Sequence, residues 1–149
     1  MEEFIKIFGG TWIYENGENI EESLRGLKTP ENMIAFLANS KPTMTIEQRG
    51  DSIFHRTEVA PGAYLDITYQ LDKEFDAKDP NDPPSYHNKA LVTFNNGRAE
   101  FTNRTQLPNA EDNFTVFTVS GDKLTSETTG LEGNKKKGVV GRRFYIKKK

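Results

Sequence analysis

The 149-residue chain contains no cysteine, no long apolar run and no excess of positive charge. Without cysteine, a disulfide framework and a thiolate zinc site are both excluded, which fits a reducing compartment such as the cytosol. No stretch reaches the roughly 20 apolar residues of a membrane-spanning helix, and the N-terminal Met1-Glu2-Glu3 lacks the positive charge of a signal peptide. The net charge of −2 argues against a nucleic-acid-binding surface. We therefore expect a cytoplasmic protein that binds no nucleic acid.

Apolar residues are also scarce, at 34% of the chain, which is low for a globular protein. This leaves two explanations open: a well-solvated surface around an ordinary core, or an interior that is itself partly polar. The length suits one domain over residues 1–149, because a chain of this size can bury most of the surface that it exposes when unfolded.

Helical periodicity is confined to a short stretch near the N-terminus. Apolar residues recur at intervals of three or four within residues 20–27 and again within residues 31–39. Pro30 suits the first turn of the second segment, and Lys41-Pro42 ends it, since proline restricts the preceding residue and lacks a donor. The sequence thus predicts two short amphipathic helices, one directly after the other.

The rest of the chain has the pattern of β-strands. A first strand is predicted at "GGTWIYENG", and from Thr43 onward strand-length segments alternate with turn signals such as Arg49-Gly50-Asp51. Two longer turns are expected, at Asp79–Asn88 and Gly130–Gly141. This spacing is typical of an antiparallel meander, and a meander of so many strands closes most easily into a barrel, which removes exposed edges.

Several segments together resemble one protein family. Gly10-Thr11-Trp12, the helix pair, the run "LANSKPTMTIEQRGDSIFHRTEV" and the terminal Arg143-x-Tyr145 are similar to the intracellular fatty-acid-binding proteins, calycins that include the cellular retinoid-binding proteins. Gly-x-Trp alone is shared with ordinary lipocalins, whereas the ungapped run to "RTE" is specific. The resemblance covers essentially the whole chain. It implies an all-β fold, a ten-stranded antiparallel up-and-down β-barrel (β-clam) with a helix-turn-helix lid over a ligand cavity.

The resemblance also implies a ligand site. In the family, the Arg-x-Tyr of the last strand faces the cavity and binds the ligand carboxylate, and by position this role falls to Arg143 and Tyr145. The chemistry fits, because a guanidinium offers forked donors to a carboxylate and a phenol adds another hydrogen bond. The family's second arginine aligns with Phe117, so the anion clamp is incomplete. Either two residues suffice, or the ligand has a less acidic head group, or the register of this gapped region differs.

Further candidates follow from strand alternation and from the lid. His55 shares an inward face with Thr57 and Val59, and it could add a hydrogen bond or a pH-dependent charge; the alternative is an interior histidine without ligand contact. The family's portal would lie near Phe36, Pro61-Gly62 and residues 79–85. The remaining predicted ligand-binding residues lie on the underside of the lid or on the late strands: Ile20, Leu24, Met33, Leu37, Thr115, Phe117, Ser126 and Thr128.

These patterns predict a monomeric intracellular carrier that binds a long-chain fatty acid or similar hydrophobic anion and delivers it to membranes or partners. The alternatives are a retinoid-like or other less acidic lipid as ligand, an abundant protective barrel whose cavity is incidental, or a small-molecule enzyme on a lipocalin-like barrel. Two distant histidines, no cysteine and no phosphate loop offer no assembled catalytic or metal site, so we expect no enzyme, metal or cofactor. The lysines at 135–137 and 147–149 either draw the protein transiently to anionic membranes or only keep it soluble.

Overall fold

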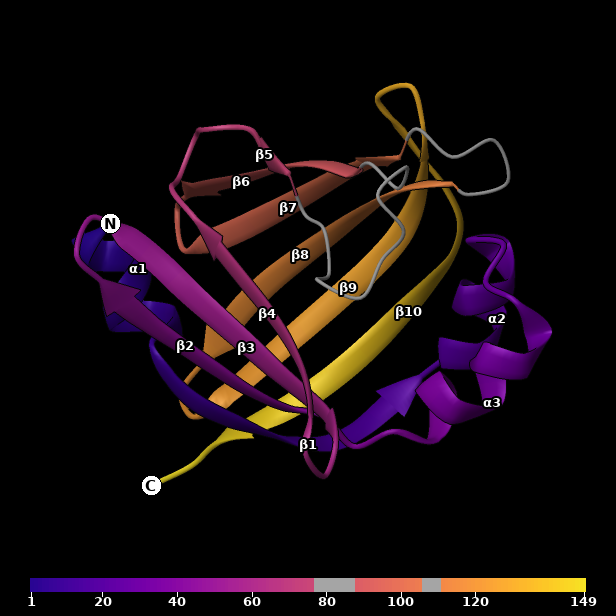
Figure 1. Ribbon diagram of the computed structural model, residues 1–149, viewed down its shortest axis with the longest axis horizontal. Helices are drawn as coiled ribbons and strands as arrows, with labels where there is room; N and C mark the ends of the chain where they lie inside the picture. Colours follow the sequence, from indigo (N-terminus) through magenta and orange to yellow (C-terminus); the bar gives the residue numbers. More distant parts are fainter. Residues whose placement is uncertain (77–87, 106–110) are drawn as a thin grey trace.

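The computed structural model describes residues 1–76, 88–105 and 111–149, which form three short helices and ten strands (Figure 1). The helices are α1 (Glu2–Phe8), α2 (Ile20–Gly26) and α3 (Glu31–Asn39). The strands are β1 (Gly10–Glu18), β2 (Thr43–Arg49), β3 (Ser52–Ala60), β4 (Ala63–Tyr69), β5 (Phe75–Asp76), β6 (Asn88–Asn95), β7 (Arg98–Thr105), β8 (Asp112–Ser120), β9 (Lys123–Glu132) and β10 (Lys135–Lys147). Except for Asn88, which begins β6, the predicted turn Asp79–Asn88 lies outside the described residues.

All ten strands belong to one antiparallel sheet with the order β4-β3-β2-β1-β10-β9-β8-β7-β6-β5. The sheet curls around an interior, with β1 to β4 on one side and β6 to β10 on the other (Figure 1). Among the described residues no ladder joins β4 to β5, so the hydrogen-bonded sheet is not closed. Side chains bridge the gap instead, because the ring of Tyr69 on β4 stacks on Phe75 of β5 with centroids 5.5 Å apart. The predicted ten-stranded β-clam is confirmed.

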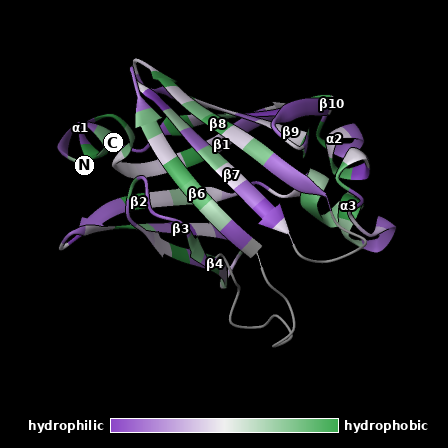
Figure 2. Cartoon of the chain, turned by 90° about the horizontal axis from the view of Figure 1, so that it is seen from above, coloured by the Kyte–Doolittle hydropathy of each residue, from purple (hydrophilic) through white to green (hydrophobic). Residues whose placement is uncertain are grey.

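The helices lie at opposite ends of the curled sheet (Figures 1 and 2). α2 and α3 follow the predicted boundaries closely and lie together at one end. α1 was not predicted, although its buried residues Phe4 and Phe8 recur at helical spacing. Its seven residues are too few for a stable isolated helix, so packing against the sheet maintains it. In the part of the chain that the structure describes, no helix has both the length and the apolar character needed to cross a bilayer.

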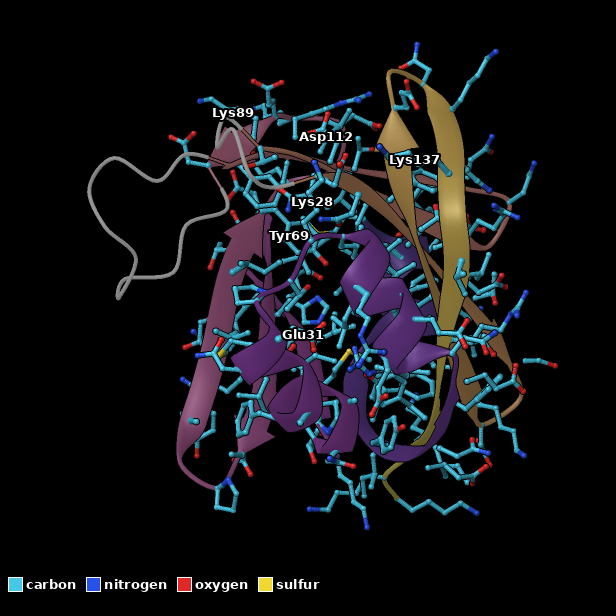
Figure 3. The ribbon with its side chains drawn as sticks, turned by 90° about the vertical axis from the view of Figure 1, so that its right-hand side faces the viewer. Lys28, Glu31, Tyr69, Lys89, Asp112 and Lys137 are labelled. Carbon is cyan, nitrogen blue, oxygen red and sulfur yellow. The ribbon has the colours of Figure 1, made fainter. Side chains whose placement is uncertain are left out.

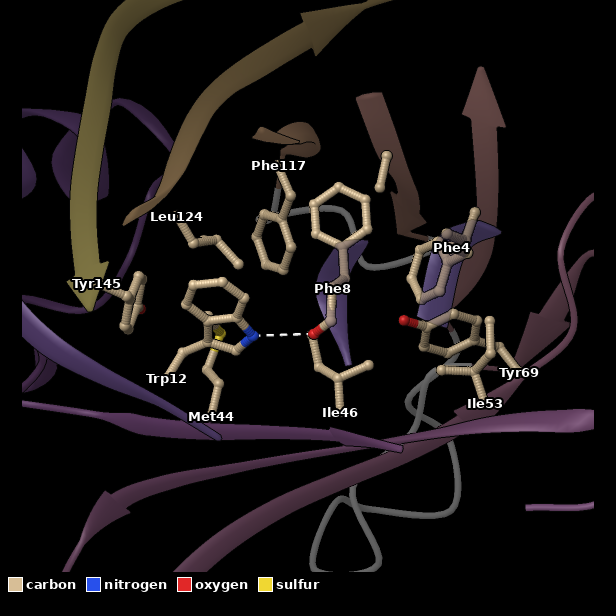
Figure 4. Packing of buried hydrophobic residues seen from close by; sticks show 12 residues of the cluster. Phe4, Phe8, Trp12, Met44, Ile46, Ile53, Tyr69, Phe117, Leu124 and Tyr145 are labelled. Carbon is tan, nitrogen blue, oxygen red and sulfur yellow. Dashed lines mark hydrogen bonds between the residues drawn. The ribbon is translucent and has the colours of Figure 1, made fainter. Parts of the chain in front are cut away.

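The apolar core fills the end of the barrel that α1 covers (Figure 4). Phe4, Phe8 and Trp12 are fully buried, and the indole Nε1 of Trp12 donates a hydrogen bond to the Phe8 carbonyl at 2.8 Å. The rings of Phe4 and Phe8 lie 5.0 Å apart, and that of Phe117 lies 6.4 Å from Phe8. α1 therefore closes this end, and the Trp12 indole joins the helix to β1.

The prediction of a long turn at Gly130–Gly141 is wrong. β9 continues to Glu132 and β10 starts at Lys135, which leaves only Gly133 and Asn134 between them. Gly133 has φ +62°, a conformation that glycine adopts readily in a tight hairpin. The register then shifts between Lys137 and Gly141, so the glycines mark a tight turn and a β-bulge within a long hairpin.

Candidate ligand-binding site

β10 turns Arg143 and Tyr145 toward the interior, the direction that the family resemblance implies for the face they share. Tyr145 is 4% exposed and packs edge-on against Tyr14 with ring centroids 5.8 Å apart. Arg143 is half-buried, and its Nη2 donates a hydrogen bond to the Leu37 carbonyl of α3 at 3.0 Å. Burial raises the pKa of the Tyr145 phenol to about 12, so it stays protonated and can donate at neutral pH.

The structure brings five predicted site residues together beneath α2. Ile20 and Leu24 from the helix meet Ser126 and Thr128 from β9 and Arg143 from β10 around a cavity of about 50 Å³. A volume of this size holds about one or two water molecules, so the lid covers the guanidinium in this structure.

α2 approaches β10 closely because position 141 has no side chain. A Cβ at Gly141 would lie 2.7 Å from the Cβ of Ser23, which is a steric clash. Ser23 is the buried residue of α2, so it contacts the sheet two residues before Arg143 on β10. This contact was not predicted, although a glycine inside a strand often marks a close approach of another segment.

An acidic residue outside the predicted set ties the lid to the sheet. Glu111, directly before β8, forms ion pairs with Lys28 between α2 and α3 at 3.0 Å and with Lys137 of β10 at 2.9 Å. Figure 3 shows both lysines at the upper end of the lid, close to Asp112. Hydrogen bonds from Lys137 and Lys28 hold the pKa of the Glu111 carboxyl below its usual value, so the carboxylate stays charged in mildly acidic solution. We call these three residues the lid clasp.

Breaking the lid clasp is expected to speed ligand exchange. Glu111→Gln removes both ion pairs, so a fluorescent fatty acid should enter and leave several-fold faster in stopped-flow measurements. Because the pKa of Glu111 is lowered, wild-type rates should stay constant down to its usual pKa and rise only as the pH falls further. Glu47→Gln, which removes an exposed ion pair with Arg49 on β2, is the control. Equal rates in wild type and Glu111→Gln would contradict a role of the clasp in gating.

The middle of the interior is aromatic where the family's second arginine would lie. Phe117 is 6% exposed, and its ring lies 4.7 Å from that of Phe101 and 5.9 Å from that of His55. Burial lowers the pKa of His55 to about 4, so the imidazole is neutral at pH 7. His55 therefore does not replace the missing positive charge at pH 7, and its two predicted roles are a hydrogen bond to the ligand or an interior position without ligand contact.

The other predicted residues differ in how far the structure buries them. The hydroxyls of Thr115 and Thr128 hydrogen-bond across β8 and β9 at 2.9 Å. Thr57 is half-buried in β3. Met33 keeps 42% of its surface exposed, whereas the buried residue of α3 is Ile34. Two inward aromatic residues that the sequence analysis missed, Tyr69 and Phe101, could have been found from the alternation in "AYLDITY" and "RAEFTNRT".

A larger recess of about 650 Å³ lies where α3 ends beside the turn between β3 and β4. This position agrees with the predicted portal, of which residues 79–85 lie outside the described residues. Phe36 at its edge is 48% exposed. The recess is lined by Ala35, Phe36, Asn39, Ser40, Lys41, Glu58, Val59, Ala60 and Pro61.

Comparison with known proteins gives no matching family model but several curated relatives. The chain is 43% identical to the liver fatty acid-binding protein of Schroederichthys bivius over 44 residues, which are 30% of this chain and 35% of that protein. It is 27% identical to cellular retinoic acid-binding protein 1 of Hippocampus comes over 120 residues, 78% of this chain and 85% of that protein. The first match thus spans about a third of its relative, and the second spans most of it.

Solved structures share the fold at low sequence identity. Apo lipid binding protein 8 of Caenorhabditis elegans superposes with a TM-score of 0.82 at 20% identity, covering 97% of both chains. The fold is therefore that of the β-clam lipid-binding proteins. The resemblance to the fatty-acid-binding and cellular retinoid-binding proteins is confirmed by the curated relatives, both of which are named as binding proteins.

Proposed function

We propose that the protein is an intracellular carrier that binds a long-chain fatty acid or a similar hydrophobic anion inside its barrel. The observation that carries this proposal is Arg143, a half-buried cation whose hydrogen bond goes to a neutral carbonyl. Among the described residues it has no ion pair, and a cation that is partly removed from water without a counter-charge favours binding of an anion. Tyr145, two residues further along the same face, supplies a neutral donor beside it. The names of the curated relatives support a lipid as the ligand.

Native mass spectrometry of the protein as purified, followed by lipid extraction, tests the proposal. We expect a bound mass in the range of a fatty acid, and the extract should contain an ionisable lipid that rebinds to the stripped protein. A protein that is empty and takes up no long-chain acid would contradict the proposal and favour the protective barrel with an incidental cavity.

A retinoid-like or other less acidic lipid is the second candidate. Phe117 favours it, because an aromatic ring stands where a second guanidinium would otherwise face the head group. The same extraction separates the two ligand classes, since a retinoid absorbs in the near ultraviolet and a simple fatty acid does not.

We further propose that the lid end of the protein delivers the ligand to anionic membranes. The exposed Phe36 and Lys41 beside the recess support this proposal, since an apolar ring and a cation together suit an anionic bilayer surface. The exposed Lys135 and Lys136 begin β10 at the same end as the lid, whereas the chain ends at the other (Figure 1). Lys137 is left out of this group because it forms an ion pair with Glu111.

Transfer of a fluorescent fatty acid to vesicles tests this delivery. Transfer to anionic vesicles should speed up with vesicle concentration and slow with salt, because surface charges are screened over about 8 Å at physiological ionic strength. Replacing Lys135 and Lys136 by glutamine should slow transfer several-fold. The control replaces Lys148 and Lys149, at the opposite end, and should change little. Transfer rates that change with neither vesicle concentration nor salt would indicate release of the ligand through water instead.

A further inference from the structure

Among the residues that the structure describes, two polar atoms in the aromatic middle of the barrel are buried without a hydrogen-bond partner. They are Nδ1 of His55 and the hydroxyl of Tyr69, in side chains that are 6% and 2% exposed. His55 lies opposite Ile67, and Tyr69 lies opposite Ile53, so the two residues are diagonal neighbours on one face of β3 and β4. Their ring centroids are 6.4 Å apart.

The surroundings of these atoms are apolar. The ring of Phe101 lies 6.1 Å from His55 and 5.9 Å from Tyr69, and the ring of Phe117 lies 5.9 Å from His55. An unpaired polar atom in apolar surroundings destabilises the folded protein. Phenylalanine at either position would avoid this loss of stability. Buried polar groups of this kind call for a specific explanation, and a hydrogen-bonding ligand atom is one.

These atoms lie within reach of a ligand that is anchored at Arg143. Across the sheet, Arg143 pairs with Ser126, and Ser126 pairs with Phe117. Two strand spacings therefore separate the backbones of Arg143 and Phe117, about 10 Å. Because the Phe117 ring contacts His55, a chain that runs from the guanidinium past Phe117 arrives at His55 and Tyr69.

We propose that the interior accepts a fatty acid that carries a second, uncharged oxygen on its chain, and that His55 and Tyr69 hydrogen-bond this oxygen. The inference rests on the proposed function, because it takes the carboxylate of the same ligand to lie at Arg143. A hydroxyl suits the pair well, since it donates one hydrogen bond and accepts others, and a neutral imidazole and a phenol can each take either role. A plain hydrocarbon chain leaves both protein atoms unpaired.

The test compares stearic acid with a series of C18 acids that carry one hydroxyl at successive positions along the chain. For wild type, isothermal titration should find positions at which the hydroxy acid binds about tenfold more tightly than stearic acid. Tyr69→Phe should reduce this preference to about threefold or less without weakening stearic acid. It should also leave the melting temperature of the ligand-free protein unchanged or raise it, because it removes an unpaired hydroxyl. His55→Phe should reduce the preference as well.

Tyr64→Phe is the matched control, the same change on the same strand at a side chain that is 47% exposed, and it should leave the preference intact. The proposal is overturned if stearic acid binds but no hydroxyl position improves binding, a result that leaves the proposed function standing. It is also overturned if Tyr69→Phe keeps the full preference, or if it lowers the melting temperature of the ligand-free protein. A protein that binds no C18 acid would overturn the proposed function together with this inference.

Discussion

Arg143→Gln is expected to weaken the binding of an ionised long-chain fatty acid about tenfold or more, at roughly 1.4 kcal/mol per decade. With Phe117 buried in aromatic contacts, Arg143 has to provide most of the positive potential for a carboxylate. A hydrogen bond between the guanidinium and a carboxylate joins two opposite charges and contributes roughly 1.5–3 kcal/mol, whereas the neutral hydroxyl of a fatty alcohol of the same length accepts a weaker one. Binding of the alcohol should therefore weaken much less, and the difference isolates the charge.

Isothermal titration of the acid and the alcohol against wild type, Arg143→Gln and Tyr145→Phe measures this effect. Tyr145→Phe is the conservative comparison, because it removes a neutral donor and keeps the ring against Tyr14. Tyr145→Phe should therefore weaken binding of the acid less than Arg143→Gln does. Equal losses for both ligands in Arg143→Gln would mean that Arg143 mainly supports the lid through the Leu37 carbonyl. If Arg143→Gln bound both ligands as tightly as wild type, the guanidinium would take no part in binding.

Phe8→Ala is expected to lower the free energy of unfolding by about 3–5 kcal/mol, the range for truncating a buried phenylalanine. Phe8 is fully buried and packs against Phe4, Phe94 and Phe117. Truncating it removes ring contacts with α1, β6 and β8 and leaves a cavity at the end that α1 closes. It also loosens the helix whose last carbonyl accepts the Trp12 indole hydrogen bond.

Urea unfolding of the ligand-free protein, monitored by the fluorescence of Trp12, measures this loss of stability. Phe36→Ala makes the same chemical change at a side chain that is 48% exposed, and it should alter stability by only about 0.5 kcal/mol. A loss of similar size in the two variants would show that α1 lies outside the cooperative core, so that the barrel end closes without it.

Local patterns in the sequence determined the elements that obey a simple period. The two lid helices follow from apolar spacing and from proline at their borders, and the antiparallel strands follow from alternation between turn signals. Alternation likewise predicted that Arg143 and Tyr145 share one face of the last strand, and the family resemblance predicted that this face points inward. These predictions succeeded because side-chain direction in a helix or strand depends on neighbours within a few residues.

The tertiary structure alone decided the contacts between distant segments. α1 is a helix because Phe4 and Phe8 fill the barrel end, and its seven residues have too little intrinsic stability to predict it. Arg143 binds the carbonyl of Leu37, and Glu111 joins Lys28 to Lys137, across separations that no local pattern records. The same holds for His55 and Tyr69, whose polar atoms, unpaired within the described part of the chain, become neighbours only when β3 and β4 curl against the rings of β7 and β8. Burial and hydrogen-bond satisfaction depend on the whole packed interior, and so the character of the site became visible only in three dimensions.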